Sequence, residues 1–269
     1  ADDGDSSDAG PRVKRRPSNV QESNPSSVVD DDEDGVNSYS TDFTNDDVRI
    51  DQLTDSDENF NVLDILSFPA RWTSCSLVNT GFMDIESSSI EGKSIHQFFH
   101  RTSSSKDFQL NIVGITRIEN PFLHSLYMLK KEEMGSRNGH VDELYLFHGT
   151  KRENVDKICE ENLDWRMFSE RHRFGQGVSF SPLATYSSHY CDTSAVKVML
   201  LFKVLVSNVV VGTENMVIPP DNDVTFDTSI KDDTSVIVKY SDNEFYPLYK
   251  ITFTKRTLPS SKPGNVPKF

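Results

Sequence analysis

The sequence predicts an α+β fold in which strands dominate. Apolar, β-branched runs typical of strands occur at five places, and Phe98 with Phe99 is also interpreted as strand material: 108–118, 144–147, 195–206, 235–240 and 245–253. Helical patterns separate some of these runs without alternating regularly with them. A doubly wound parallel sheet requires that alternation, so we expect α+β instead.

Charge divides the 269-residue chain into two parts. Residues 1–60 carry 17 acidic and 5 basic side chains, a net charge of −12, whereas the whole chain carries −14. This leading segment is rich in Asp, Ser, Asn and Pro, and it cannot bury enough apolar surface to offset the entropy of ordering. We expect residues 1–60 to be a disordered acidic segment, 61–256 to form one domain, and 257–269 to be a tail.

Cysteine content and short motifs bear on the cellular compartment. The three cysteines, Cys75, Cys159 and Cys191, are odd in number and lack paired spacing, which favours a reducing compartment without a disulfide framework. No apolar run reaches the roughly 18 residues of a membrane span. Lys14–Arg16 is either a nuclear import signal or an incidental basic patch. We expect residence in the nucleus or cytoplasm and, since the chain begins without Met, a longer parent protein.

Three helices are predicted from their capping signals. Asn120-Pro121 starts the first, with Asn as cap and Pro in the first turn, and Gly135–Gly139 ends it. Thr150 and Glu153 fit a capping box for the second. Ser181-Pro182 starts the third, where apolar and polar residues at spacings of three and four share one side: Leu183, Tyr186, Ser187 and Tyr190.

The last third of the chain contains further strand patterns. Residues 195–206 and 209–211 are almost continuously apolar, which predicts central buried strands. Residues 212–233 are interpreted as a long acidic loop, and loops of this length are usually functional. The runs at 235–240 and 245–253 are expected to pair as a hairpin.

Single motifs give weak catalytic signals. His148-Gly149 at a strand end places an imidazole beside bare backbone, but such a histidine is more often structural. His172, His189 and Cys191 lack the spacing of metal ligands, so no metal site is expected. Gly175-Gln176-Gly177 lacks the third glycine and lysine of a phosphate loop. Neither a Ser-His-Asp order nor a pair of catalytic carboxylates stands out.

Four ordered motifs together are more specific. They are Phe-His-Gly-Thr at 147–150, Phe-Gly-Gln-Gly-x-x-Phe at 174–180, Tyr186-Ser187 with Tyr190, and Tyr-Pro-x-Tyr at 246–249. This set resembles the catalytic domains of the poly(ADP-ribose) polymerase family, which are diphtheria-toxin-like ADP-ribosyltransferases. It is most similar to the mono-ADP-ribosylating subgroup that includes the dioxin-inducible enzyme and the zinc-finger antiviral protein. The resemblance covers roughly residues 65–256 and implies mostly antiparallel sheets with flanking helices around an NAD cleft.

The resemblance also implies roles for individual residues. Gly149, with Thr150 beside it, matches the glycine whose backbone grips the nicotinamide carboxamide, and Ser187 matches the serine that bonds the same amide. Tyr190 matches the aromatic residue that stacks on the nicotinamide ring. His148 matches the histidine that bonds a ribose hydroxyl and orients NAD. By the same resemblance, 165–175 is the loop over NAD and 212–233 faces the acceptor.

The resemblance fails at two positions of the family's His-Tyr-Glu triad, which here reads His148, Ser179 and Leu248. Leu248 cannot accept a hydrogen bond, so it cannot activate an acceptor hydroxyl for chain elongation. Ser179 removes one of two aromatic faces at the nicotinamide, and aromatic pairing is worth about 0.5–1.5 kcal/mol beyond area burial. Mono-transferring relatives also carry apolar residues at the third position.

Two functions follow as expectations. The first is a protein mono-ADP-ribosyltransferase that moves one ADP-ribose from NAD, its co-substrate, to acceptor proteins without a metal. The alternative is a weak or inactive pseudoenzyme that serves as a binding or regulatory module, as Ser179 and Leu248 suggest. We expect no direct nucleic-acid binding by this segment, because its folded part is nearly neutral and phosphate contacts need clustered basic residues.

Overall fold

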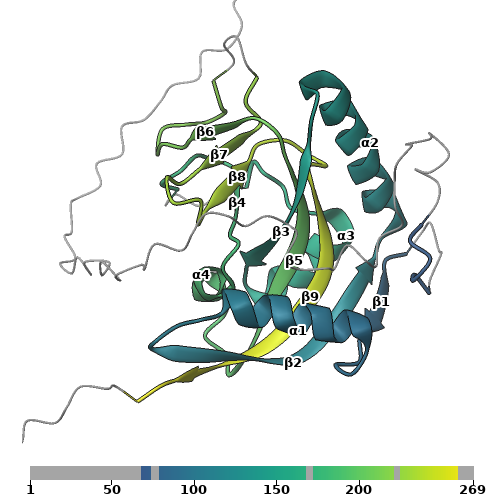
Figure 1. Ribbon diagram of the computed structural model, residues 1–269, viewed down its shortest axis with the longest axis vertical. Helices are drawn as coiled ribbons and strands as arrows, with labels where there is room; N and C mark the ends of the chain where they lie inside the picture. Colours follow the sequence, from purple (N-terminus) through teal and green to yellow (C-terminus); the bar gives the residue numbers. More distant parts are fainter. Residues whose placement is uncertain (1–67, 74–78, 168–171, 221–224, 260–269) are drawn as a thin grey trace, which may run out of the picture. The chain divides into compact units, whose positions relative to one another are not determined.

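The computed structural model describes residues 68–73, 79–167, 172–220 and 225–259. The segment predicted to be disordered, 1–60, lies outside the described residues, as do residues 260–269 of the predicted tail. Figure 1 shows the described part of the chain in colour.

The main element is a five-stranded antiparallel sheet (Figure 1). Its order is β1-β2-β9-β5-β3. The strands are β1 Gly81–Asp84, β2 Phe108–Glu119, β9 Phe245–Thr257, β5 Val196–Val206 and β3 Asp142–Gly149. Long β-branched and aromatic runs in β2, β5 and β9 explain why these three strands form its centre.

A second sheet of four short strands has the order β4-β8-β7-β6. Its strands are β4 Val178–Phe180, β8 Ile237–Lys239, β7 Thr228–Ile230 and β6 Val209–Val211. The pairs are antiparallel except β6 with β7. An isolated bridge joins the two sheets, because Phe147 of β3 and Ser181 exchange both backbone hydrogen bonds, at 2.8 and 3.0 Å.

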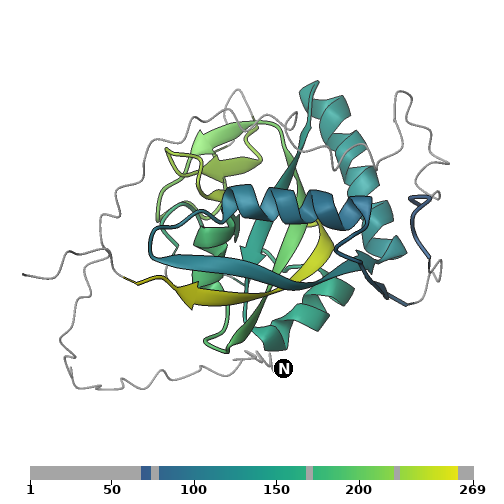
Figure 2. The same cartoon turned by 60° about the horizontal axis from the view of Figure 1, so that its bottom comes forward.

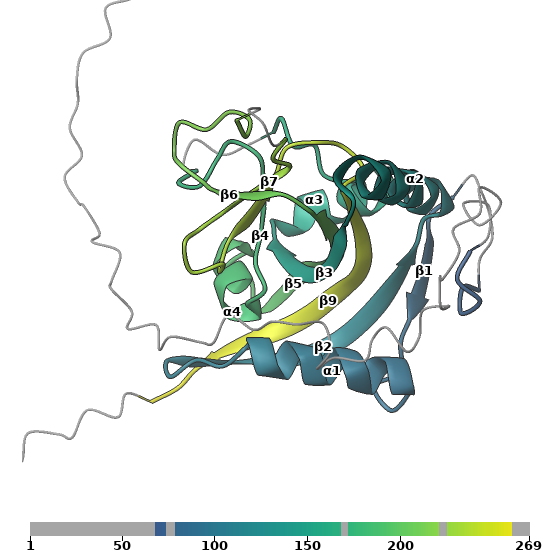
Figure 3. The ribbon, with the colours of Figure 1, turned by 45° about the horizontal axis from the view of Figure 1, so that its top comes forward.

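Helices cover the two faces of the five-stranded sheet. α1 Ile90–Thr102 lies along β2 (Figure 3). With α2 Pro121–Asn138 it contributes to the first core cluster. α3 Arg152–Glu161 packs against β5 and contributes to the second cluster. In Figures 1 and 2, α2 and the second sheet lie on opposite sides of the long strands. The predicted α+β class is confirmed.

Local sequence explains where the helices begin and end. Asn120 caps α2 as predicted, accepting a hydrogen bond from the Leu123 N–H at 3.1 Å, and Gly139 ends it in the left-handed region at φ 79°. Phe98 and Phe99 were expected in a strand, but they lie in α1. With Ile95 they form its buried face at spacings of three and four, and Ser89 caps this helix.

Three predictions about the last third are wrong. Val209–Val211 forms the exposed edge strand β6 and not a central strand. The segment 212–233 is not a continuous loop, since it contains β7. The runs at 235–240 and 245–253 do not pair with each other, because β8 joins the second sheet and β9 the first.

A buried ion network explains why β8 pairs in the second sheet and not with β9, the next strand in the sequence. The Lys239 ammonium, fully buried, lies 2.8 Å from the Asp227 carboxylate and 3.0 Å from that of Glu244. Asp227 precedes β7 and also accepts the N–H groups of Ser207 and Asn208. Because a buried charge needs partners, Lys239 fixes β8 beside β7.

Candidate active site

His148 lies near the end of β3 and is held by strand β4. Its Nδ1 is 3.0 Å from the carbonyl oxygen of Ser179, and its ring packs against Phe180 and Phe202. A carbonyl can only accept, so Nδ1 carries the proton. Burial lowers the pKa of His148 despite this hydrogen bond, which leaves the ring neutral with Nε2 as an acceptor.

Gly149 lies in direct backbone contact with the short helix α4 Ala184–Ser187. A Cβ atom at Gly149 would be 2.0 Å from the Ser187 carbonyl oxygen and 3.0 Å from the Tyr190 Cβ. Only glycine permits this approach. The contact therefore brings Ser187 and Tyr190 to the end of β3.

Ser187 is buried, at 3% exposure, and its hydroxyl donates to the Phe147 carbonyl at 3.1 Å. The donor of this hydroxyl is thus already committed, while the oxygen keeps acceptor capacity. Tyr190 ends the one-turn 3₁₀ helix η4 Ser188–Tyr190 and is 55% exposed. The site therefore combines a fixed acceptor oxygen with an accessible aromatic face.

Thr150 follows β3 but does not cap α3, so the predicted capping box is wrong. The helix begins one residue later, with Lys151 at the cap position and no side-chain cap bond. The Thr150 hydroxyl instead accepts from the Asn154 amide at 3.2 Å. The backbone N–H of Arg152 donates to the Asp192 carboxylate at 2.8 Å, which takes over the capping role.

Ser179 lies on β4 directly opposite Val238 of β8. Cross-strand partners project to the same face of a sheet, and on this face Val236, Val238 and Tyr240 form a third apolar cluster with Tyr186 packed against it. The short Ser179 side chain is exposed and adds no ring there. The side chain of residue 179 therefore does not cover this sheet face with a ring.

Leu248 is not brought to this group. It is 3% exposed in the first core cluster, whereas Phe180 and Phe202, the ring neighbours of His148, belong to the second. The β5–β9 register is irregular here, pairing Phe202 with Pro247 and leaving Leu248 over as an extra residue. The structure thus collects His148, Gly149, Thr150, Ser179, Ser187 and Tyr190 around β3, β4 and α4, but Leu248 lies in the core.

Val236 and Val238 lie buried in the third cluster next to Ser179, at 2% and 0% exposure, and were not predicted as neighbours of the site from the sequence. They alternate with Tyr240 at a period of two, and this signal was assigned to a hairpin with β9. Correct pairing of β8 with β4 would have placed them next to Ser179. None of these three residues, two valines and a tyrosine, carries a carboxylate.

The loop before β4 is tied to the segment that follows β6. The Phe174 carbonyl accepts from the Ser229 hydroxyl at 2.6 Å, and the Gln176 N–H donates to the Met216 carbonyl at 2.7 Å. Gly175 has φ 126°, and a Cβ there would collide with the Tyr240 hydroxyl. These contacts fix the base of the loop 165–175 against the third cluster.

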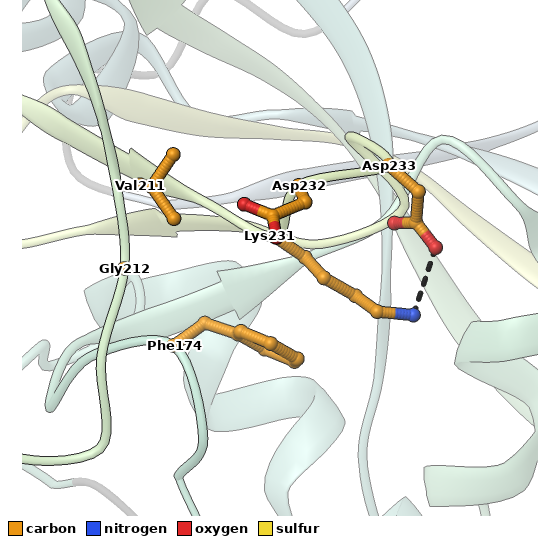
Figure 4. Close-up of a pocket in the computed structure, with 6 residues that line it drawn as sticks. All are labelled: Phe174, Val211, Gly212, Lys231, Asp232 and Asp233. Carbon is orange, nitrogen blue, oxygen red and sulfur yellow. Dashed lines mark ion pairs between the residues drawn. The ribbon is translucent and has the colours of Figure 1, made fainter.

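A small pocket of about 200 Å³ lies beside this loop base (Figure 4). Figure 4 shows the Phe174 ring on one side and the Lys231–Asp233 ion pair, 2.8 Å long, on another. Lys231 also lies over the Phe174 ring. Within the described ranges no group of three His, Cys, Asp or Glu side chains could hold a metal ion.

Comparison with known proteins identifies the family of the chain. Residues 89–255 match the family model described as the poly(ADP-ribose) polymerase catalytic domain. The chain belongs to the poly(ADP-ribose) polymerase family. The resemblance stated from the four motifs is therefore confirmed. None of the helices in the described part of this family member is both long and apolar enough to cross a membrane.

Several relatives in this family are named mono-ADP-ribosyltransferases. The chain is 34% identical over 210 residues to protein mono-ADP-ribosyltransferase PARP12 of Homo sapiens, covering 74% of the chain and 29% of that protein. It is 31% identical to PARP11 of Mus musculus, over 53% of the chain and 52% of that protein. It is also 30% identical to the zinc finger CCCH-type antiviral protein 1 of Mus musculus, over 48% of the chain and 13% of that protein. The chain spans only part of each relative.

Proposed function

We propose that this chain is a protein mono-ADP-ribosyltransferase, which transfers a single ADP-ribose from NAD to an acceptor protein and releases nicotinamide. The relatives named as mono-ADP-ribosyltransferases support this proposal. The observation that carries it is the contact of Gly149 with Ser187, which gathers the candidate NAD-binding groups at the end of β3.

His148 would orient the ribose of NAD. Its Nδ1–H donates to Ser179, so the lone pair of Nε2 is available to accept a hydrogen bond from a ribose hydroxyl. Nδ1 and Nε2 cannot exchange their donor and acceptor roles, because the backbone of β4 fixes the tautomer of the ring. Such fixed positioning is one way in which an active site lowers a barrier.

The carboxamide of nicotinamide would lie between Gly149 and Ser187. The Ser187 hydroxyl donates to Phe147 and would accept from the amide N–H, while the backbone of Gly149 would bond the rest of the carboxamide. The exposed ring of Tyr190 offers a stacking surface for the pyridine ring. Holding the leaving group in this way positions the bond that breaks.

The side chains near Ser179 and Leu248 favour a single transfer. Val236 and Val238 in the third cluster and Leu248 in the first are apolar and buried, so none of them can activate an acceptor hydroxyl. A carboxylate of an acceptor protein needs no such activation, because it is already deprotonated at neutral pH. Its oxygen forms the new bond to the ribose C1′, while the bond to nicotinamide breaks and its electron pair leaves with nicotinamide.

Labelled NAD tests this function directly. The full chain incubated with it should transfer the label to protein, and His148→Ala should reduce labelling by at least about a hundredfold, the scale of a lost positioning group. His140→Ala, a change of an exposed histidine outside the site, is the matched control. Labelling that is unaffected by His148→Ala would refute the assignment.

A second candidate is a pseudoenzyme that binds ligands or partners without turning over NAD. Ser179 favours it, since this exposed residue adds no ring at the proposed nicotinamide site. Calorimetry with a non-hydrolysable NAD analogue, run beside the labelling assay, separates the two functions. Binding without transfer, or no binding, supports the pseudoenzyme.

Residence in the nucleus or cytoplasm is part of the proposal. The absence of paired cysteine spacing supports a reducing compartment. A fluorescent fusion of the full chain tests it, and Ala substitutions at Lys14, Arg15 and Arg16 show whether this basic run directs nuclear import.

A further inference from the structure

Tyr190 is an exposed aromatic residue whose ring has a defined partner. Its hydroxyl donates to the Tyr186 hydroxyl at 3.0 Å, and the two ring centroids lie 5.5 Å apart with an interplanar angle of 47°. Its Cβ atom lies close to Gly149, but 55% of the residue is exposed. An exposed tyrosine without a partner would sample several rotamers.

Unlike the exposed Tyr190, Tyr186 is anchored by packing against other side chains. It packs against the third cluster, on the sheet face that carries Val236 and Val238. Burial raises the pKa of its phenol above the ordinary value for tyrosine. Tyr186 thus connects the exposed ring to the second sheet.

Ser179 makes this connection more important. It projects to the same sheet face as Val238, which Tyr186 covers, and supplies no ring opposite the tyrosine pair. A planar ligand at this place therefore depends on one aromatic wall instead of two. The orientation of this single aromatic ring then determines the affinity for the planar ligand.

We propose that Tyr186 is the positioning residue of the aromatic subsite, holding the Tyr190 ring ready to stack on a planar carboxamide ligand. The inference rests on the proposed function for the identity of that ligand, nicotinamide. Pre-ordering one side chain saves the entropy of ordering it on binding, which corresponds to about two- to tenfold in affinity.

A double-mutant cycle of Tyr186→Phe and Tyr190→Phe in the full chain tests this. Both changes keep the ring and remove one hydroxyl, so each breaks the same hydrogen bond. The probe is benzamide, which presents the same carboxamide on an aromatic ring, measured by calorimetry. Each single variant should weaken benzamide about two- to tenfold, and the double variant should bind like either single one, because the hydroxyls act as a pair.

Kinetics with NAD separate KM from kcat, and a purely structural role of Tyr186 would not change KM alone. Tyr186→Phe should raise KM for NAD by the same two- to tenfold and leave kcat within about twofold, because the hydroxyl orders the site before binding. Tyr127→Phe is the matched control, since its hydroxyl bonds Glu143 at 2.6 Å away from the site. That control should lower the melting temperature without changing KM.

Three results would overturn the inference: benzamide affinity unchanged in Tyr186→Phe, a double variant weakened by the product of the single effects, or a parent chain that does not bind benzamide. If the parent binds benzamide but transfers no ADP-ribose, the proposed function fails, while the calorimetric cycle still decides the role of Tyr186.

Discussion

The Nδ1 of His148 lies 3.0 Å from the carbonyl oxygen of Ser179, so a backbone group of β4 sets the tautomer of a side chain on β3. This arrangement does not depend on the side chain of residue 179. The side chain at position 179 can therefore be changed without loss of the histidine's orientation, so the effect of an added ring and the effect of the histidine can be tested separately.

Restoring an aromatic ring should tighten NAD binding. Ser179→Tyr places a second ring on the open sheet face opposite Val238. The added aromatic pair is worth about 0.5–1.5 kcal/mol, so the KM for NAD or the Kd for benzamide should fall up to about tenfold. Ser179→Ala should leave both constants unchanged, since the carbonyl that orients His148 remains. Weaker binding by the tyrosine variant would contradict the proposed position of the ligand.

A Cβ atom at Gly149 should separate β3 from α4. Gly149→Ala puts this atom 2.0 Å from the Ser187 carbonyl oxygen, so the backbones must move apart. Benzamide binding should fall by at least about tenfold, because the groups that would hold the carboxamide no longer converge. Gly135→Ala in α2, where the nearest atom is 3.7 Å away, should bind normally. Equal binding by both variants would show that the contact is not needed.

The buried network around Lys239 should dominate the stability of the second sheet. Lys239→Met leaves the Asp227 carboxylate buried without its cation and Glu244 with only the Lys130 ammonium, 3.8 Å away, which should cost about 3–5 kcal/mol of the free energy of unfolding. Lys231→Met breaks the more exposed pair with Asp233 and should cost less than about 1 kcal/mol. Urea unfolding measures both. Similar losses would mean that the buried network contributes no more than a surface pair.

Mild acid should destabilise the fold through His124. Burial lowers the pKa of His124 to about 4, against 6.5 in the unfolded chain, so below pH 6.5 the unfolded state binds the extra proton. The contribution of neutral His124 to the free energy of unfolding is therefore fully present above pH 6.5 and is lost as the pH drops towards 4. Between pH 7.5 and 5 the loss from this group should be about 2 kcal/mol.

The partly buried His148 acts in the same direction, because its pKa is also lowered. Urea unfolding across this pH range tests the prediction, with His124→Gln as the comparison. The variant should show a flatter dependence between pH 7.5 and 5. An unchanged slope would show that His124 is not buried in its neutral form.

Local signals predicted some of the fold correctly. The cap at Asn120 and the left-handed Gly139 define α2 through contacts within a few residues. Phe98 and Phe99 were misassigned because two adjacent aromatic residues favour a strand unless the apolar residues three and four positions away are considered.

Pairing between distant strands was harder to predict. The run at 235–240 is adjacent in sequence to β9, yet the ion network of Lys239 with Asp227 pairs it with β7 and β4. No local pattern encodes that network. Leu248 was assigned to the third catalytic position by its motif, and its place in the first core cluster could not be derived from that motif.

The transfer of single ADP-ribose units can be measured by mass spectrometry of an acceptor protein after incubation with the chain and NAD, with released nicotinamide quantified in parallel. We expect mass additions of single ADP-ribose units and one nicotinamide released for each unit transferred. Chains of several units on one site, or bound ligand without any transfer, would contradict it.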